Sequence, residues 1–260
     1  MTRVLLATRN AKKLVELRRI VDAAGLDGIE ILGLADVDEF PEAPETGATF
    51  AENALAKARD AALATGLPAI ADDSGITVDA LNGMPGIFSA RWAGRHGDDE
   101  ANLRLLLGQT EDVPDERRGA AFVCAAALVT PDGAAAPLLP EGGAGPDSAG
   151  PDSAGPDSAG PDSSGPGSAG QDSSGPGSGG PGSGGPGTGD GVPGRIVVHG
   201  TWRGTLLRAP RGDNGFGYDP IFAPEGENRS SAELSAQEKD GASHRGLALR
   251  VLVPHLRAGL

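Results

Sequence analysis

Two adjacent carboxylates, Asp72 and Asp73, follow a short apolar run in the stretch LPAIADDSG. Side chains of neighbouring strand residues point to opposite faces of a sheet, so at least one of the two is expected to face a site. A carboxylate at a strand end lies where α/β proteins usually bind ligands, and Mg²⁺ takes a few carboxylates together with phosphate oxygens. The alternative is an Asx turn that closes the strand, with Ser74 and Gly75 as turn residues.

A third carboxylate, Glu45, precedes an expected helix in PETGATFAENALAKA. Thr49 and Glu52 fit a capping box, which favours a structural role for Glu52. Glu45 is free to be a metal ligand, although a lone glutamate is more often an ordinary surface residue. Asn53 and Lys57 are four residues apart and therefore share one face of the helix.

Three cations gather in ATRNAKK, where a strand is expected to turn into a helix. Cations are disfavoured at a helix N-terminus, because its open N–H groups attract anions. A phosphate bound beside Arg9, Lys12 and Lys13 would make these cations favourable at this position. The alternative is that Thr8 or Asn10 caps the helix and the lysines are solvated.

Basic side chains again occupy an expected helix N-terminus near the end of the chain, where His244 and Arg245 follow the expected N-cap Ser243. A lone histidine is usually a surface or core residue. Together with Lys239 upstream, however, the three side chains offer donors to oxygen atoms.

The stretch RGDNGFGYDPIFAPEG combines glycines with aromatic side chains. Gly215 and Gly217 flank Phe216, and Tyr218 follows, so the backbone can approach a flat ligand on which an aromatic ring stacks. Asp219 precedes a proline and favours a turn. The alternative is an ordinary glycine-rich loop with two packed aromatic residues.

Strands alternate with helices along the chain, which indicates an α/β fold. Residues 118–133 and 194–210 are expected to form the two arms of one hairpin, interrupted by a Pro/Gly/Ser-rich, disordered insert at 142–191. Residues 1–260 are therefore expected to be one folded domain with one inserted loop. Further strands are expected at 3–8, 29–34 and 67–75, and helices at 10–25, 49–66, 98–110 and 243–259, the last with a kink at Pro254.

The composition favours a cytoplasmic protein that binds neither nucleic acid nor membrane. The net charge of -14 argues against a general nucleic-acid binder. The single cysteine, Cys124, lies in an apolar run and is expected to be a core residue, which fits a reducing compartment. The apolar run of the N-terminus is too short for a signal peptide or a membrane span.

Six motifs in this order resemble the inosine triphosphate pyrophosphatase family, also called Ham1-like proteins. They are TRNAKK, ETGATFAENALAKA, LPAIADDSG, GMPGIFSARWAG, GFGYDPIF and AELSAQEKDGASHRG. The resemblance covers the chain apart from roughly residues 132–195. Two departures are Arg9, where many members of the family have glycine, and the insert, which is foreign to the family pattern.

The resemblance implies an elongated mixed β-sheet flanked by helices, in two lobes with a central active-site cleft. It also implies a cytosolic homodimer that uses Mg²⁺ to hydrolyse the non-standard purine nucleoside triphosphates ITP, dITP and XTP to the monophosphate and pyrophosphate. Asp73 is implied as the general base and, with Glu45, as a Mg²⁺ ligand, while Asp72 is expected to support them. The implied substrate-binding residues are Thr8, Arg9, Asn10, Ala11, Lys12, Lys13, Lys57, Ser74, Phe216, Gly217, Tyr218, Asp219, Lys239, His244 and Arg245.

Two other functions remain open on the sequence. One is a related Maf-like pyrophosphatase with other nucleotides, against which SHR and GFGYDP argue. The other is a nucleotide-binding sensor or scaffold, which would need no metal-binding carboxylates.

Overall fold

The computed structural model describes residues 1–26, 28–41, 44–135 and 194–258. All of them belong to one compact unit, made of Met1–Glu141 and Thr188–Leu260. The predicted disordered insert at 142–191 lies outside the described residues.

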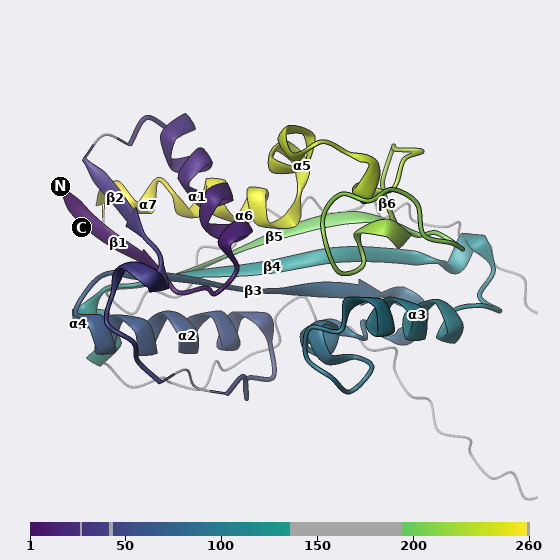
Figure 1. Cartoon of the computed structure of the whole chain (residues 1–260), viewed down its shortest axis with the longest axis horizontal. Coiled ribbons are helices and arrows are strands. Elements are labelled where there is room, and N and C mark those ends of the chain that lie inside the picture. The colour runs from purple at the N-terminus through teal and green to yellow at the C-terminus, as the bar shows by residue number, and fades with distance from the viewer. Residues whose placement is uncertain (27, 42–43, 136–193, 259–260) are drawn as a thin grey trace, which may run out of the picture. The chain divides into compact units, whose positions relative to one another are not determined.

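One mixed six-stranded sheet forms the centre of this unit, in the order β2-β1-β3-β4-β5-β6 (Figure 1). β1 runs parallel to β2 and β3, whereas the pairs β3–β4, β4–β5 and β5–β6 are antiparallel. The predicted mixed sheet and the pairing of the two hairpin arms are thereby confirmed. The strands are β1 Thr2–Leu6, β2 Ile29–Leu32, β3 Ala69–Val78, β4 Gly119–Val129, β5 Arg195–Leu206 and β6 Phe222–Pro224.

β3 continues past the two carboxylates to Val78, three residues beyond the expected end at residue 75, so neither carboxylate lies at a strand end and the alternative Asx turn is wrong. Every residue of β3 pairs with β4, with Asp72 opposite Ala126 and Asp73 opposite Ala125. The small apolar side chains of β4 allow this ladder to continue through the carboxylates to Val78. The two aspartates therefore lie within the strand.

The other edge of β3 is paired only at its start. β1 pairs with Ala69 and Ile70, and among the described residues no strand continues this pairing beyond Ile70. Asp72, Asp73 and Ser74 therefore lie where a second strand no longer covers the edge of β3.

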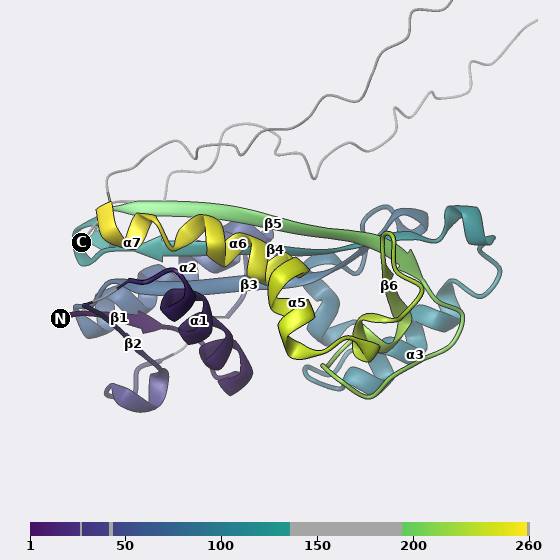
Figure 2. The same ribbon diagram turned by 90° about the horizontal axis from the view of Figure 1, so that it is seen from above.

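Helices cover both faces of the sheet (Figures 1 and 2). One face carries α1, α5, α6 and α7, and the other carries α2 and α3. A short α4 follows β4. The bounds are α1 Ala11–Ala23, α2 Phe50–Thr65, α3 Asp99–Gln109, α4 Pro131–Ala135, α5 Ala236–Ala242, α6 His244–Leu252 and α7 His255–Ala258.

The packing follows these layers. One buried cluster joins α1 and α6 to the sheet and includes Cys124, which is fully buried as predicted. A second cluster joins the alanine-rich α2 to the opposite face. A third, around Phe122, Trp202 and Phe222, fills the far end of the long strands.

Local capping explains where the helices begin and end. Asn10, Thr49 and Ser243 cap α1, α2 and α6, and Gly66 ends α2 with φ of 65°. The predicted kink at Pro254 is a break between α6 and α7. Within the described part of the chain, no helix is long and apolar enough to cross a membrane.

Candidate active site

Asp72 and Asp73 present their carboxylates to opposite faces of the sheet. Asp72 accepts hydrogen bonds from Lys13 Nζ of α1 at 2.7 Å and from Arg245 Nε of α6 at 3.1 Å. Asp73 faces α2 and accepts hydrogen bonds from Lys57 Nζ at 3.0 Å and Asn53 Nδ2 at 3.0 Å. The predicted alternation is confirmed, and the two aspartates belong to two separate networks.

On the α1/α6 face, the guanidinium of Arg245 makes contacts in three directions. Nε binds Asp72, Nη1 lies 3.4 Å from Glu16 Oε2, and Nη2 donates to Ser74 Oγ at 3.0 Å. Burial alone would raise the pKa of Asp72, but attraction to Lys13 and Arg245 holds it well below its usual value. Asp72 is therefore a fixed anion between two cations.

On the α2 face, Lys57 bridges the two carboxylates that were predicted to bind metal. Its Nζ lies 2.6 Å from Glu45 Oε1 and 3.0 Å from Asp73 Oδ1. Burial raises the pKa of the Asp73 carboxyl, although Lys57 opposes the shift. Burial also acts to raise the pKa of Glu45, but Lys57 and Arg91 outweigh it and lower that pKa. The surroundings thus shift the two carboxyl pKa values in opposite directions, upward for Asp73 and downward for Glu45.

Asn53 holds Asp73 in place, a role that the sequence did not reveal beyond its shared face with Lys57. Asn53 is 2% exposed, and its Oδ1 accepts the N–H of Gly47 at 2.8 Å. This bond fixes the amide orientation, so Nδ2 must point to Asp73. Asn53 therefore connects the loop that carries Glu45 to the strand that carries Asp73.

Arg91 is a second residue that the sequence reasoning missed. It ends the short helix Gly86–Arg91 in GMPGIFSARWAG, and its Nη1 lies 3.0 Å from Glu45 Oε2. Ser89 of this helix accepts the N–H of Ile76 in β3 at 2.9 Å, and a Cβ on Gly75 would overlap Ser89. The contact between Arg91 and Glu45 depends on how this helix is held against β3. The sequence alone therefore does not reveal it.

A cavity of about 830 Å³ opens on the α1/α6 face of β3. This volume falls within the range of about 300–1,000 Å³ that is typical of small-molecule sites. Its lining combines aromatic with polar and charged side chains, including Phe122, Trp202, Glu16, Ser74, Lys239 and His244. The cavity can therefore enclose a flat ring beside several charged groups.

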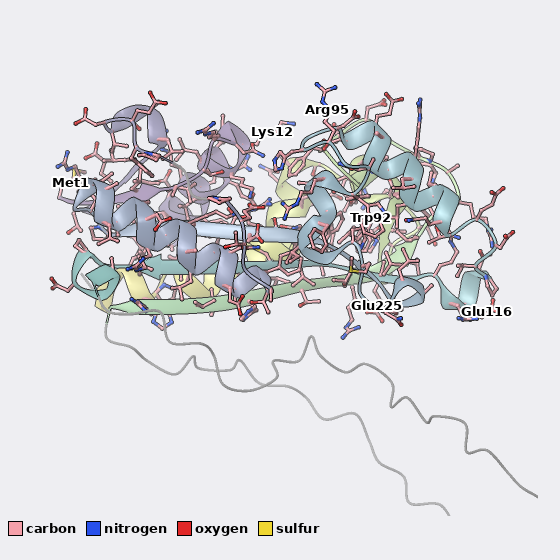
Figure 3. The ribbon with its side chains drawn as sticks, turned by 90° about the horizontal axis from the view of Figure 1, so that it is seen from below. Met1, Lys12, Trp92, Arg95, Glu116 and Glu225 are labelled. Carbon is pink, nitrogen blue, oxygen red and sulfur yellow. The ribbon has the colours of Figure 1, made fainter. Side chains whose placement is uncertain are left out.

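Phe216 lies at this cavity on the glycine loop. The residue is 44% exposed, and Lys12 Nζ and Arg245 Cζ lie 5.8 Å and 5.9 Å from its ring centroid. Gly217, with φ of 62°, donates its N–H to Asp99 of α3 at 2.9 Å. Lys12, labelled in Figure 3, belongs to the first turn of α1 and lines the same cavity. Phe216 is thus available for stacking on a ligand.

Tyr218 and Asp219, in contrast, turn inward. The Tyr218 hydroxyl donates to the carbonyl of Ser89 at 2.8 Å. Asp219 accepts the N–H of Phe216 at 2.9 Å and pairs with Lys239 Nζ at 2.8 Å. These two side chains shape the loop around Phe216, and Lys239 is held beside it.

The imidazole of His244 is buried at this cavity, and one of its nitrogens makes no hydrogen bond among the described residues. Its ring stacks on Phe122 with centroids 5.0 Å apart, and Nδ1 is buried without a hydrogen-bond partner among the described residues. Burial, reinforced by Arg245, lowers the pKa of His244 well below its usual value. The ring therefore stays neutral and can offer one donor and one acceptor.

The start of α1 lies between this cavity and a smaller one. Asn10 Oδ1 accepts the N–H of Lys12 at 3.0 Å, and Thr8 Oγ1 accepts the N–H of Asn10 at 3.2 Å. Ala11 is the first residue of α1 and lines the larger cavity. Arg9 lines the smaller cavity of about 400 Å³ together with Lys57. The predicted phosphate-binding segment thus lies next to both networks.

Glu45 and Asp73 fit a hard divalent cation such as Mg²⁺. Both are oxygen donors, and each keeps part of its side chain accessible, 26% and 11% respectively. Nowhere in the described ranges do three or more His, Cys, Asp or Glu side chains gather in a metal-binding arrangement. A cation held by these two carboxylates therefore needs further oxygens, such as those of phosphate groups.

Comparisons with known proteins agree with this architecture. The Ham1 family matches residues 4–142 and 189–255, and the chain belongs to this family. It is 50% identical over 258 residues to a dITP/XTP pyrophosphatase of Nocardia farcinica, covering 99% of this chain and 96% of the relative. A dITP/XTP pyrophosphatase of Mycobacterium bovis is 48% identical over 257 residues, with the same two shares covered.

Solved structures give the same result. A nucleoside-triphosphatase / dITP/XTP pyrophosphatase of Mycobacterium abscessus superposes with a TM-score of 0.64 at 45% identity, covering 98% of this chain and all of the other. A HAM1 protein of Coxiella burnetii superposes with a TM-score of 0.70 at 33% identity, covering 99% and 100%.

Proposed function

We propose that this chain hydrolyses the non-standard purine nucleoside triphosphates ITP, dITP and XTP to the nucleoside monophosphate and pyrophosphate. The observation that carries the proposal is the pair of networks on β3. One face offers a large cavity with an exposed aromatic ring, and the other offers two carboxylates with two cations. The names of the relatives give two of these three substrates, dITP and XTP.

The base and the phosphates are assigned to different faces of β3. The base would occupy the larger cavity beside Phe216 and His244. The phosphates would cross the part of the β3 edge that β1 leaves unpaired, next to the start of α1. There they meet Lys13 from one network and Lys57 from the other.

Asp73 is assigned as the general base. Its raised pKa suits it to accept a proton from a water molecule that attacks the α-phosphorus. The new bond joins the water oxygen to the α-phosphorus, and the bond to the oxygen bridging the α- and β-phosphorus breaks, so that this oxygen leaves with pyrophosphate. Lys13, Lys57 and Arg91 neutralise charge on the phosphates during this step. When bound by Glu45 and Asp73, Mg²⁺ would stabilise negative charge on the same phosphates.

Selection of the base rests on donors that face a 6-oxo group. The neutral His244 and the cations Lys239 and Arg245 lie at the cavity. Donors placed there form hydrogen bonds with a 6-oxo group. The 6-amino group of adenine would instead face another donor and remain unpaired. An unpaired buried group of this kind costs about 1–3 kcal/mol.

The assembly and the compartment complete the proposal. We infer a cytoplasmic homodimer that binds neither nucleic acid nor membrane. The net charge of -14 supports the absence of nucleic-acid binding, because the phosphate backbone would be repelled.

Hydrolysis of ITP in ¹⁸O-labelled water with Mg²⁺ tests the reaction directly. Attack at the α-phosphorus places the label in IMP and leaves pyrophosphate unlabelled. Label in pyrophosphate, or release of IDP and inorganic phosphate, would contradict the proposal. Asp73→Asn serves as the inactive control.

A further inference from the structure

Lys57 occupies the position between the two carboxylates that are assigned to Mg²⁺. Its ammonium lies 2.6 Å from Glu45 Oε1, 3.0 Å from Asp73 Oδ1 and 3.4 Å from the carbonyl oxygen of Asp72. An ammonium has three N–H donors, so Lys57 uses its full capacity here. Its side chain is only 18% exposed.

The remaining carboxylate oxygens are engaged as well. Glu45 Oε2 accepts from Arg91 Nη1 at 3.0 Å, and Asp73 Oδ2 accepts from Asn53 Nδ2 at 3.0 Å. All four oxygens therefore already have a protein donor, and two cations balance the two negative charges.

A free divalent cation would have to displace Lys57 before it could bind both carboxylates. Mg²⁺ also gives up its hydration water reluctantly. A triphosphate changes this balance, because its oxygens are alternative acceptors for Lys57 and Arg91. Once Lys57 turns to a phosphate, Glu45 Oε1 and Asp73 Oδ1 are released together.

We propose that Lys57 acts as an internal cation that makes divalent-cation binding conditional on the triphosphate. Mg²⁺ then enters the site with the nucleotide, and the unliganded protein does not take up the ion on its own. This inference rests on the proposed function for the identity of the metal ligands. It adds an order of events, and it assigns Lys57 a second role beside phosphate binding.

The test is a titration of the unliganded protein with Mn²⁺, which replaces Mg²⁺ and is followed by electron paramagnetic resonance. Lys57→Met keeps the length of the side chain and removes its charge. We expect the variant to bind one Mn²⁺ at least tenfold more tightly than the wild type, and its melting temperature to rise with added Mn²⁺. Equal affinities of wild type and variant would overturn the inference.

Lys239→Met is the matched control. Lys239 is also 18% exposed and pairs at 2.8 Å with a carboxylate, which in the described part of the chain is that of Asp219 alone. We expect this control to bind Mn²⁺ no better than the wild type. A gain equal to that of Lys57→Met would show a general charge effect and would also overturn the inference.

A double variant locates the gained site. Adding Glu45→Gln to Lys57→Met is expected to abolish the gain in Mn²⁺ affinity, whereas persistence of the gain would place it elsewhere and contradict the inference. These titrations contain no nucleotide and no turnover. Their outcome is therefore independent of whether the wild type hydrolyses ITP, which separates failure of this inference from failure of the proposed function.

Discussion

Asp72 and Asp73 are consecutive residues of β3, yet Asp72 binds Lys13 and Arg245 on one face of the sheet while Asp73 binds Lys57 and Asn53 on the other. The strand itself thus separates an anion that holds two cations from a carboxylate with a raised pKa. The two aspartates are therefore expected to respond differently to the same substitution.

Asp73→Asn is expected to lower kcat for ITP by at least about 10²-fold with little loss of stability, because a general base alone is typically worth about 10²–10⁴-fold. Raising Mg²⁺ should restore little activity, since the base is lost together with the metal ligand. Steady-state kinetics over a Mg²⁺ series measure both effects. If Asp72→Asn is the less active of the two enzymes, the assignment within the pair is wrong.

Asp72→Asn is expected to act mainly on stability. Asp72 is 6% exposed, and its loss leaves Lys13 and Arg245 without their shared anion. Removing one partner of a buried ion pair typically costs about 3–5 kcal/mol. Denaturant unfolding at neutral pH should show a clear loss for Asp72→Asn and a smaller one for Asp73→Asn. The reverse order would contradict the two networks.

Asn53→Asp tests whether Asn53 positions the base. The substitution keeps the acceptor for Gly47 but places an oxygen against Asp73 Oδ2. We expect kcat to fall at least about tenfold, because Asp73 is then repelled instead of held. A tenfold loss corresponds to about 1.4 kcal/mol of lost transition-state stabilisation.

Asn102→Asp is its matched control. Asn102 is also 2% exposed and bridges two backbone groups, accepting from Ala93 N at 2.7 Å and donating to the Ala90 carbonyl at 3.1 Å. Both variants should lose stability, but only Asn53→Asp should lose most of its kcat. Equal losses of kcat in the two variants would show that Asn53 has only a structural role.

His244 predicts a pH-dependent term in stability. Its pKa in the folded chain is well below the ordinary value of 6.5, so below pH 6.5 the unfolded chain binds a proton that the folded chain does not. The wild type should therefore lose up to about 2 kcal/mol more than His244→Gln between pH 8 and pH 5, at about 1.4 kcal/mol per pH unit below 6.5. Chemical denaturation at the two pH values checks this, and an equal pH dependence of both proteins would refute it.

Deletion of residues 143–189 is expected to leave the melting temperature and kcat/KM nearly unchanged. The family match omits residues 143–188, and this stretch contains no aromatic residue, lysine or arginine. Calorimetry and ITP turnover of the shortened chain test the prediction. A large loss of activity with an intact fold would assign the segment a function.

Much of the fold could be predicted from local sequence. The hairpin arms, the helix caps at Asn10, Thr49 and Ser243, and the burial of Cys124 depend on patterns within a few residues. The length of β3 could not be predicted, because Ser74 and Gly75 are typical turn residues. Their strand conformation depends on β4, which lies some fifty residues further along the chain.

The candidate site was likewise predicted only in part. Glu45 and Asp73, predicted as metal ligands, and Lys57, predicted to bind substrate, lie together. Asn53 and Arg91 were missed, because their contacts join elements that are distant in sequence. Lys239 and Arg245 were predicted to offer donors to oxygen atoms, and the folded chain shows that each also pairs with a carboxylate of the protein.

The central claim is tested most directly by kcat/KM for pyrophosphate release from ITP, XTP, ATP, GTP, dTTP and UTP with Mg²⁺. We predict that ITP and XTP are turned over far faster than the other four. The donors at the larger cavity favour a 6-oxo purine over ATP, and GTP, which shares the 6-oxo group, has to be rejected at its 2-position. Equal turnover of ATP and ITP, or a preference for dTTP or UTP, would contradict this account.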